Sequence, residues 1–153
     1  MSERVPRELL FGNPEKASPK ISPNGKLWAY LAPDEGVLNI WAGPEGASAK
    51  PLTKDRGRGI RTFLWAEDER SILYVQDKDG DENWHLYQTD VATGATRDLT
   101  PYPGVQAQIV ATEPRFPDEI LVALNDRDPR AHDVWRVNLK DGSRALEATN
   151  PGD

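Results

Sequence analysis

The sequence has 153 residues and no cysteine, which excludes disulfides, thiolate metal sites and cysteine nucleophiles. Its formal net charge of −6 disfavours nucleic acid or an anionic membrane surface as a partner. The N-terminal segment, residues 1–16, is charged and has no apolar stretch long enough for a signal peptide or a membrane span, so we expect a cytoplasmic protein with no membrane partner.

A repeat of roughly 47 residues begins after this segment, at residue 17. An aliphatic-aromatic pair recurs at separations of 46 and 48 residues, as Ile40-Trp41, Leu86-Tyr87 and Val134-Trp135. Each copy then closes on a threonine, at Thr53, Thr100 and Thr149. We expect the four Trp residues on these strands, Trp28, Trp41, Trp65 and Trp135, to pack in the core, since aromatic side chains dominate cores.

Each copy has the signals of β-structure, because short runs rich in Val, Ile, Leu, Tyr and Trp follow turn-forming stretches. In the first copy these runs predict four strands, at 17–22, 26–32, 37–43 and 47–53. Four strands repeated at this period are typical of a β-propeller blade. A propeller ring has about 4 to 8 blades. The sequence therefore predicts an all-β fold, a partial β-propeller of about three four-stranded antiparallel blades from a larger ring. The blades are expected near 17–53, 60–100 and 105–149 within a propeller portion spanning 17–153.

Particular stretches carry a family resemblance. SPNGKLWAYLAP, residues 22–33, is similar to the Ser-Pro-Asp-Gly-Lys turn and strand of many bacterial propellers, with Asn24 in place of Asp. Three longer stretches resemble the N-terminal propeller of prolyl oligopeptidase family serine peptidases, particularly the dipeptidyl aminopeptidase and acylaminoacyl peptidase branch. They are PRELLFGNPEKASPKISPNGK (6–26), DKDGDENWHLY (77–87) and LNDRDPRAHDVWRVNL (124–139). The resemblance implies a partner, a C-terminal α/β-hydrolase domain that holds a Ser-Asp-His triad.

No catalytic residue is expected in these 153 residues. The nucleophile elbow of that hydrolase domain requires Gly-x-Ser-x-Gly, and none of the six serines lies in such a motif. His85 and His132 also lack a recognisable nucleophile context, so we expect structural roles for both. The hydrolase domain is expected to lie outside this sequence, and peptide hydrolysis to belong to the full-length parent protein.

The loop QDKDGDENW, residues 76–84, raises the question of a metal site. Asp77, Asp79, Asp81 and Asn83 alternate as the first ligands of an EF-hand calcium loop do. The remainder of that pattern is missing, because glycine falls at the fourth position, Gly80, and the twelfth position is Gln88 in place of glutamate. We therefore expect neither a metal nor any other cofactor.

Three loops, residues 33–36, 77–84 and 125–133, join the second and third strands of their copies and are expected on one face of the propeller. Their formal charges together equal the net charge of the whole chain, −6. One interpretation is that these loops are only polar turns. The other is an acidic rim that attracts a substrate's amino group or pairs with the hydrolase domain. Its candidates are Asp81 and Glu82, then Asp79, with Trp84 for substrate contact and Arg127 and Arg130 as partners for hydrolase carboxylates.

Two functions remain open from the sequence. The first is a propeller segment that gates and selects peptide substrates for a prolyl oligopeptidase-like serine peptidase. The second is a non-enzymatic propeller scaffold that binds protein partners, as many WD-type repeats do. The three family-like stretches favour the first.

Overall fold

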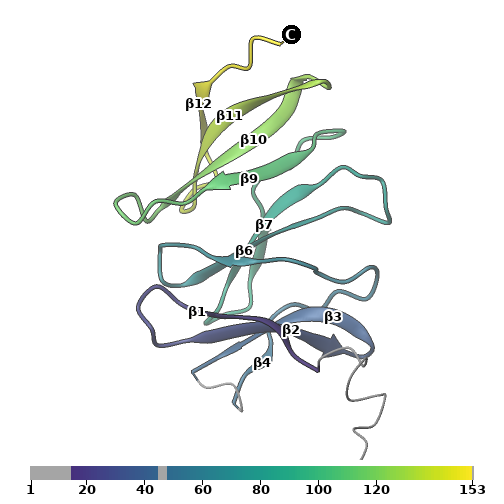
Figure 1. The fold of residues 1–153 in the computed structure, drawn as a ribbon, viewed down its shortest axis with the longest axis vertical. Coiled ribbons are helices and arrows are strands. Elements are labelled where there is room, and N and C mark those ends of the chain that lie inside the picture. Colours follow the sequence, from purple (N-terminus) through teal and green to yellow (C-terminus); the bar gives the residue numbers. More distant parts are fainter. Residues whose placement is uncertain (1–14, 45–47, 153) are drawn as a thin grey trace, which may run out of the picture.

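The computed structural model describes residues 15–44 and 48–152. These residues form twelve strands in three sheets, and no helix occurs among them (Figure 1). Accordingly, none of the described segments is a helix that is long and apolar enough to cross a membrane. The sequence also predicts a single helical turn that begins at Pro6, and this segment lies outside the described residues.

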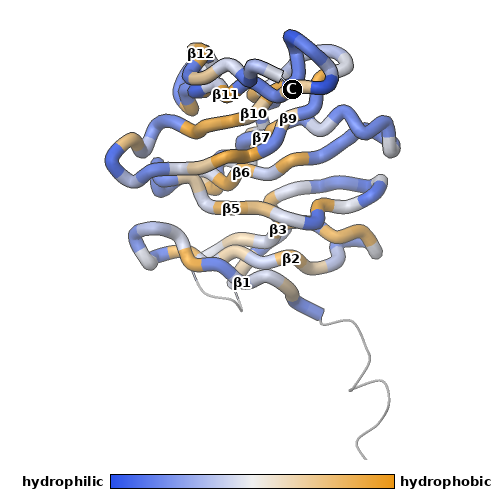
Figure 2. The backbone as a smooth tube through the Cα atoms, turned by 45° about the horizontal axis from the view of Figure 1, so that its top comes forward, coloured by the Kyte–Doolittle hydropathy of each residue, from blue (hydrophilic) through white to orange (hydrophobic). Residues whose placement is uncertain are grey.

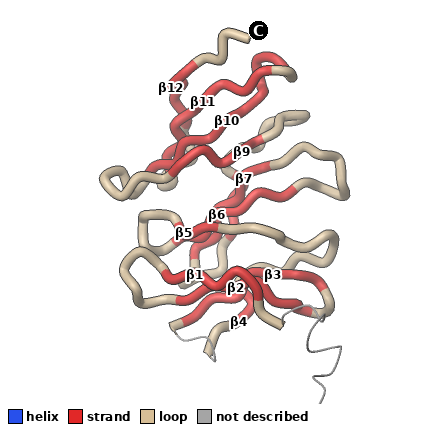
Figure 3. Tube along the Cα trace, in the orientation of Figure 1, coloured by secondary structure: helices blue, strands red, loops and turns tan. Residues whose placement is uncertain are grey.

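Each sheet has four antiparallel strands in sequence order, which confirms the predicted fold class (Figure 3). The strands of the first sheet are β1 (Ala17–Ile21), β2 (Trp28–Asp34), β3 (Val37–Gly43) and β4 (Lys50–Pro51). Those of the second are β5 (Leu64–Trp65), β6 (Ser71–Gln76), β7 (His85–Asp90) and β8 (Thr96–Asp98). Those of the third are β9 (Ala107–Ala111), β10 (Glu119–Asp128), β11 (Ala131–Asn138) and β12 (Arg144–Ala148).

The sheets stack in sequence order, and two apolar clusters fill the spaces between them (Figure 1). Phe63, Ile40 and Ile72 are fully buried members of the cluster between the first and second sheets. Leu73, Leu86 and Leu124 belong to the cluster between the second and third sheets. Apolar segments follow the strands, and hydrophilic ones gather at the hairpin loops (Figure 2). Each sheet therefore depends on its neighbour for burial, as expected for a repeat architecture.

The recurring aromatic residues of the first two copies, Trp41 and Tyr87, have a common structural role. Trp41 pairs across the strands with Tyr30, and Tyr87 pairs with Tyr74. In both pairs the rings are stacked, with centroids 6.4 and 5.4 Å apart. Such cross-strand pairs are units of sheet stabilisation. In the third copy the partner is aliphatic, since Trp135 pairs with Val122.

The tryptophan predictions have mixed outcomes. Trp65 is buried in the first cluster, and Trp135 packs, partly buried, against the second. Trp41 is half-buried on the face of the first sheet that points away from the second sheet, since its neighbour Ile40 faces that sheet. The core prediction for Trp28 is wrong, because this residue begins β2 at the end of the sheet and is 39% exposed.

The closing threonines of the first two copies are explained by hydrogen bonds, whereas Thr149 of the third copy is exposed. The backbone N–H of Ile40 donates to Thr53 Oγ1 and that of Leu86 to Thr100 Oγ1, both at 2.9 Å. Both threonines are buried, and each ends its blade by satisfying a donor of the neighbouring strand. The fourth strand is accordingly shorter than predicted in the first copy: β4 ends at Pro51, and Leu52 bonds back to the Ile40 carbonyl at 2.7 Å.

Candidate functional site

The three acidic hairpin loops and the two linkers between sheets lie on one side of the stack (Figure 3). The second loop, between β6 and β7, is anchored by Asp77, whose carboxylate is only 3% exposed. Asp77 Oδ2 accepts a hydrogen bond from Arg58 Nη1 at 2.9 Å and from the backbone N–H of Glu82 at 3.4 Å. Arg58 comes from the linker between the first two sheets, so this pair connects the linker to the loop.

The backbone of this loop is in an unusual conformation. Asp79 and Glu82 have φ angles of 55° and 59°, and Gly80 has a φ of 86°. The left-handed region is uncommon for residues other than glycine, and residues held there cluster at functional sites. The side chains of Asp79 and Glu82 are exposed and form no hydrogen bond or ion pair with any described residue. The loop therefore presents two free carboxylates to solvent.

Asp81 has a different environment from its two neighbours. Its carboxylate accepts hydrogen bonds from the backbone N–H of Asn83 at 3.0 Å, from Asn83 Nδ2 at 3.2 Å and from the backbone N–H of Lys78 at 3.3 Å. These bonds, led by the Asn83 backbone donor, lower the pKa of Asp81. The turn interpretation thus accounts for Asp81. No group of three or more His, Asp or Glu in the described part of the chain is arranged to hold a metal ion.

Arginines neutralise much of the expected acidic rim. Arg56 pairs with both Asp34 and Glu35 of the first loop at 3.0 Å. Residues 54–61 of the linker, KDRGRGIR, contain four basic residues and one acidic residue, a formal charge of +3. Sequence reasoning missed these arginines as part of the site, although the basic run itself was a visible signal. The side of the stack that carries the loops is therefore mixed in charge.

The charged side chains of the third loop pair with one another. Arg127 donates to Asp133 through Nε at 2.7 Å and through Nη2 at 2.9 Å, and Nη2 also reaches the Asn150 carbonyl at 2.7 Å. Arg130 pairs with Asp128 in its own turn, through Nη2 at 3.1 Å. Both candidate arginines are thus engaged within their hairpin, and pairing with hydrolase carboxylates stays a prediction.

Asp133 is a buried hub of this hairpin. Its side chain is 2% exposed, and it accepts a further hydrogen bond from the backbone N–H of Asn150 at 2.8 Å. The Arg127 donors, followed by the Asn150 N–H, lower the pKa of Asp133 from 3.8 to about 2. The carboxylate therefore fixes the chain after β12 against the start of β11.

We expect acid to loosen this hairpin in a defined pH range. A carboxyl whose pKa is depressed by folding stabilises the fold fully above its unfolded pKa, and this contribution is lost as the pH falls through the folded pKa. For Asp133 the loss is expected between about pH 4 and pH 2. Amide hydrogen exchange at Asn150 should be slower in the wild type than in Asp133→Asn at neutral pH, and the difference should shrink over that range. A difference that stays constant from pH 5 to pH 2 would contradict this account.

Asp133 has equivalents in the other sheets, because Asn39 and His85 also stand directly before the repeated aliphatic-aromatic pair. Asn39 is fully buried and contacts Thr53 and Asp55, which follow β4. His85 Nδ1 lies 2.6 Å from Asp98 Oδ2 at the end of β8. Each of these three side chains thus connects the third strand of its sheet to the end of the fourth strand or to the residues that follow it. This contact supports a structural role for His85.

A cavity of about 490 Å³ lies beside the second loop. It is open to solvent on one side and is bordered by the first linker, the end of β6, the loop that leads into β7, and β9. Its lining includes Trp84, which was proposed from the sequence for substrate contact, together with Arg58, Arg61, Asp77, Gln106 and Ile109. The Trp84 carbonyl accepts from the Ala107 N–H at 2.7 Å, and Gln106 Nε2 donates to the Glu82 carbonyl at 3.0 Å. These two bonds join the loop to the third sheet.

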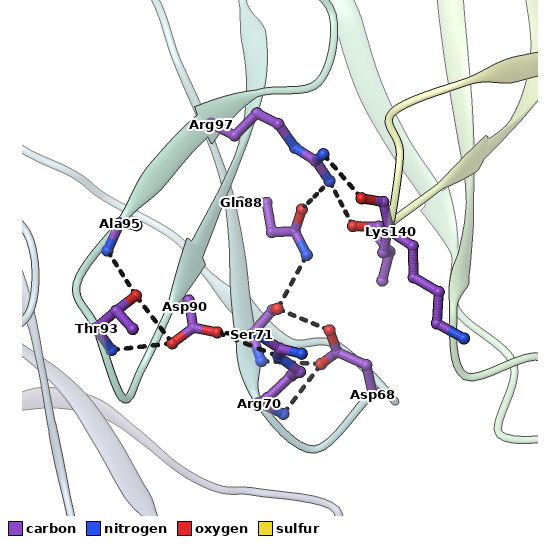
Figure 4. Close-up of polar contacts among 10 residues, drawn as sticks. Asp68, Arg70, Ser71, Gln88, Asp90, Thr93, Ala95, Arg97 and Lys140 are labelled. Carbon is purple, nitrogen blue, oxygen red and sulfur yellow. Dashed lines mark hydrogen bonds and ion pairs between the residues drawn. The ribbon is translucent and has the colours of Figure 1, made fainter.

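The opposite side of the stack has a polar network that links two sheets (Figure 4). Ser71 Oγ donates to Asp68 Oδ2 at 2.7 Å and accepts from Gln88 Nε2 at 2.9 Å. Gln88 Oε1 accepts from Arg97, which also donates to the Leu139 and Lys140 carbonyls of the β11–β12 turn. Ser71 is 1% exposed, and no histidine takes part in the network. This network therefore joins the second and third sheets. The candidate site lies on the other side of the stack, which carries the three acidic hairpin loops.

Comparison with known proteins identifies relatives of this chain. No protein family model matches the chain. The chain is 43% identical, over 97% of its length, to dipeptidyl aminopeptidase BIII of Pseudoxanthomonas mexicana, and 30% identical, over 95%, to dipeptidyl peptidase family member 6 of Caenorhabditis elegans. It spans only about a fifth of these curated relatives, 22% and 21% of their lengths.

Solved structures agree on the fold. The β-propeller domain of the Trilobed protease from Pyrococcus furiosus superposes with a TM-score of 0.62 at 22% identity, covering 87% of this chain and 42% of that one. The stacked four-stranded sheets are thus blades of a propeller. The chain is therefore a β-propeller region that is homologous to part of the dipeptidyl aminopeptidases it matches.

Proposed function

We propose that this chain gates and selects substrates for a serine peptidase that removes dipeptides from peptide ends. The observation that carries the proposal is the 43% identity to a dipeptidyl aminopeptidase over nearly the whole chain. The family resemblance implies that an α/β-hydrolase domain performs the hydrolysis. The propeller then determines which peptides reach that domain.

The side with the acidic loops is the surface proposed for this role. Asp79 and Glu82 are exposed and are free of partners among the described residues, so they are available to attract a peptide's amino group or a basic residue of the hydrolase domain. Trp84 supplies an aromatic surface beside them. Asp81, Arg127 and Arg130 are engaged within their own loops, and their contribution is to hold the loops in position.

The test uses the full-length protein and two lengths of substrate. A short chromogenic dipeptide derivative measures the chemistry, and a peptide of six or more residues measures passage along the propeller. Replacing Trp84 by Ala is expected to raise KM for the longer peptide about fivefold, because an aromatic contact of about 1 kcal/mol is lost. The kcat for the short substrate should stay unchanged.

The control variant is Trp84→Phe, which keeps an aromatic ring and should restore most of the lost affinity. Equal kinetics of the wild type and Trp84→Ala on the longer peptide would refute a gating role for this surface. Failure of the full-length protein to hydrolyse any dipeptide derivative would refute the peptidase and favour the alternative, a non-enzymatic scaffold for protein partners.

A further inference from the structure

The cavity beside the second loop has an excess of positive charge. Among its lining residues the ionisable side chains are Arg58, Arg61 and Asp77. Asp77 is the single acid of the three, and its buried carboxylate is paired with Arg58. Arg61 is exposed and forms no hydrogen bond or ion pair within the described ranges. One full positive charge is therefore available to a ligand.

Arg58 is held in place although it is half-exposed. The ion pair to Asp77 uses Nη1, and Gly80 lies so close that a Cβ atom there would be 2.7 Å from that nitrogen. The ion pair restricts the guanidinium, while its remaining N–H groups have no partner in the part of the chain that the structure describes. An arginine that is already oriented loses little entropy when it binds an anion.

The remainder of the lining is apolar or amide. Trp84, Val75 and Ile109 supply apolar surface, and Gln106 and Gln108 supply amide groups. Gln106 Nε2 donates one N–H to the Glu82 carbonyl, and its Oε1 is available as an acceptor for a backbone N–H. This combination of two guanidinium groups, an aromatic ring and an amide acceptor matches a peptide segment that carries a carboxylate next to an apolar side chain.

We infer that the cavity binds a peptide carboxylate, held by Arg61 with support from Arg58. The inference rests on the proposed function, since it assigns a part of the peptide substrate to this cavity. A carboxylate has two sources in a peptide, the C-terminus and an acidic side chain. Arginine recognises both through the same paired N–H···O hydrogen bonds.

The experiment measures peptide binding to the full-length protein by fluorescence anisotropy, before any turnover. The probes are four labelled peptides of equal length: one with a free C-terminus and a neutral sequence, its C-terminal amide, and the amide with one Glu or one Gln. Binding should be about tenfold tighter for whichever peptide carries the recognised carboxylate. Tighter binding of the free acid identifies the C-terminus, and tighter binding of the Glu peptide identifies an acidic side chain.

Arg61→Gln should remove this preference, so that the charged and neutral peptides bind equally. The matched control is Arg115→Gln, since Arg115 is 80% exposed and its one ion-pair partner among the described residues is Glu113 in the β9–β10 turn. This control should keep the tenfold preference. Equal binding of all four peptides to the wild type, or a preference that survives Arg61→Gln, would overturn the inference.

The two proposals fail separately. Loss of the preference in Arg61→Gln supports the carboxylate site even if no dipeptide derivative is hydrolysed. Hydrolysis of dipeptide derivatives with no carboxylate preference would keep the proposed function and reject the site. Inorganic phosphate at millimolar concentration is a final probe: full displacement of the charged peptide would show a general anion site and reject a peptide carboxylate as its specific ligand.

Discussion

Replacing Asn39 by Asp is expected to destabilise the first blade by about 3–5 kcal/mol at neutral pH, because it places a charge in a fully buried site. Asn39 Nδ2 donates to the carbonyls of Val37 and Asp55 at 3.1 and 3.0 Å. Its Oδ1 accepts from Thr53 Oγ1 and from the Asp55 backbone N–H at 2.9 and 2.7 Å. An aspartate keeps the shape and the two acceptor contacts, but it loses both donors and directs a carboxylate oxygen at two carbonyls.

The effect should spread along the linker that carries the arginines. Asp55 accepts from the Gly59 N–H at 2.6 Å, so the turn that holds Arg56 and Arg58 begins at the residue that Asn39 fixes. Hydrogen exchange of the amides of Ile60 and Leu52 should accelerate by more than about 100-fold, as expected for a local loss of 3 kcal/mol. Slow exchange of both amides in the variant would contradict the role assigned to Asn39.

The pH dependence distinguishes this mechanism from a general packing defect. Burial raises the pKa of a carboxyl above its unfolded value. Such a carboxyl lowers the free energy of unfolding least when the pH is below its unfolded pKa. The loss of stability grows as the pH rises from the unfolded pKa to the folded pKa. The destabilisation by Asn39→Asp should therefore be smallest near pH 4 and largest at neutral pH.

Asn138→Asp is the matched control for this variant. Asn138 Oδ1 accepts hydrogen bonds from the backbone N–H groups of Lys140 at 2.8 Å and Asp141 at 3.3 Å, and its Nδ2 has no partner among the described residues. An aspartate makes the same bonds in such a turn, so this variant should retain wild-type exchange rates. A comparable loss in both variants would mean that the amide donors of Asn39 are not the cause.

The blades could be predicted from the sequence because each repeated signal corresponds to a local contact. In the first two copies the aromatic positions recur because Trp41 and Tyr87 pair across adjacent strands, and the closing threonines recur because their hydroxyl groups satisfy a strand donor. Hairpin partners are close in sequence, so turn residues and alternation are sufficient to define them. This is why the number of strands and their antiparallel order were predicted correctly.

The site was less predictable because its contacts cross between blades. Asp77 and Arg58 are 19 residues apart, and nothing in either local pattern indicates that the buried carboxylate meets this arginine. Counting the charge of the loops alone therefore predicted a more acidic surface than the structure has. Trp84 could be singled out because it has no equivalent in the other copies, whereas Gln106 lies in an ordinary linker and has no sequence signal.

Replacing Gly80 by Ala is expected to cost about 2–3 kcal/mol and to disturb the cavity. Gly80 has a φ of 86°, where an alanine costs roughly 1–2 kcal/mol. An added Cβ would also lie 2.7 Å from Arg58 Nη1, so the end of this flexible side chain must shift, which weakens its ion pair with the nearly buried Asp77 carboxylate. Because Arg58 is half-exposed and can be solvated, we expect this second contribution to be about 1 kcal/mol, below the full cost of a broken buried pair.

Gly36→Ala separates the two contributions, because Gly36 occupies the equivalent hairpin tip of the first blade with a φ of 82° and no atom within 4 Å of an added Cβ. It should show the backbone cost alone, measured as the shift in thermal unfolding temperature. Only Gly80→Ala should in addition weaken binding of the carboxylate peptide, since Arg58 is displaced from the wall that it shares with Arg61. Equal shifts and equal peptide binding in the two variants would show that the contact between Gly80 and Arg58 does not position the guanidinium. A larger shift with lost binding in Gly80→Ala alone would tie the glycine in this acidic loop to the chemistry of the cavity beside it.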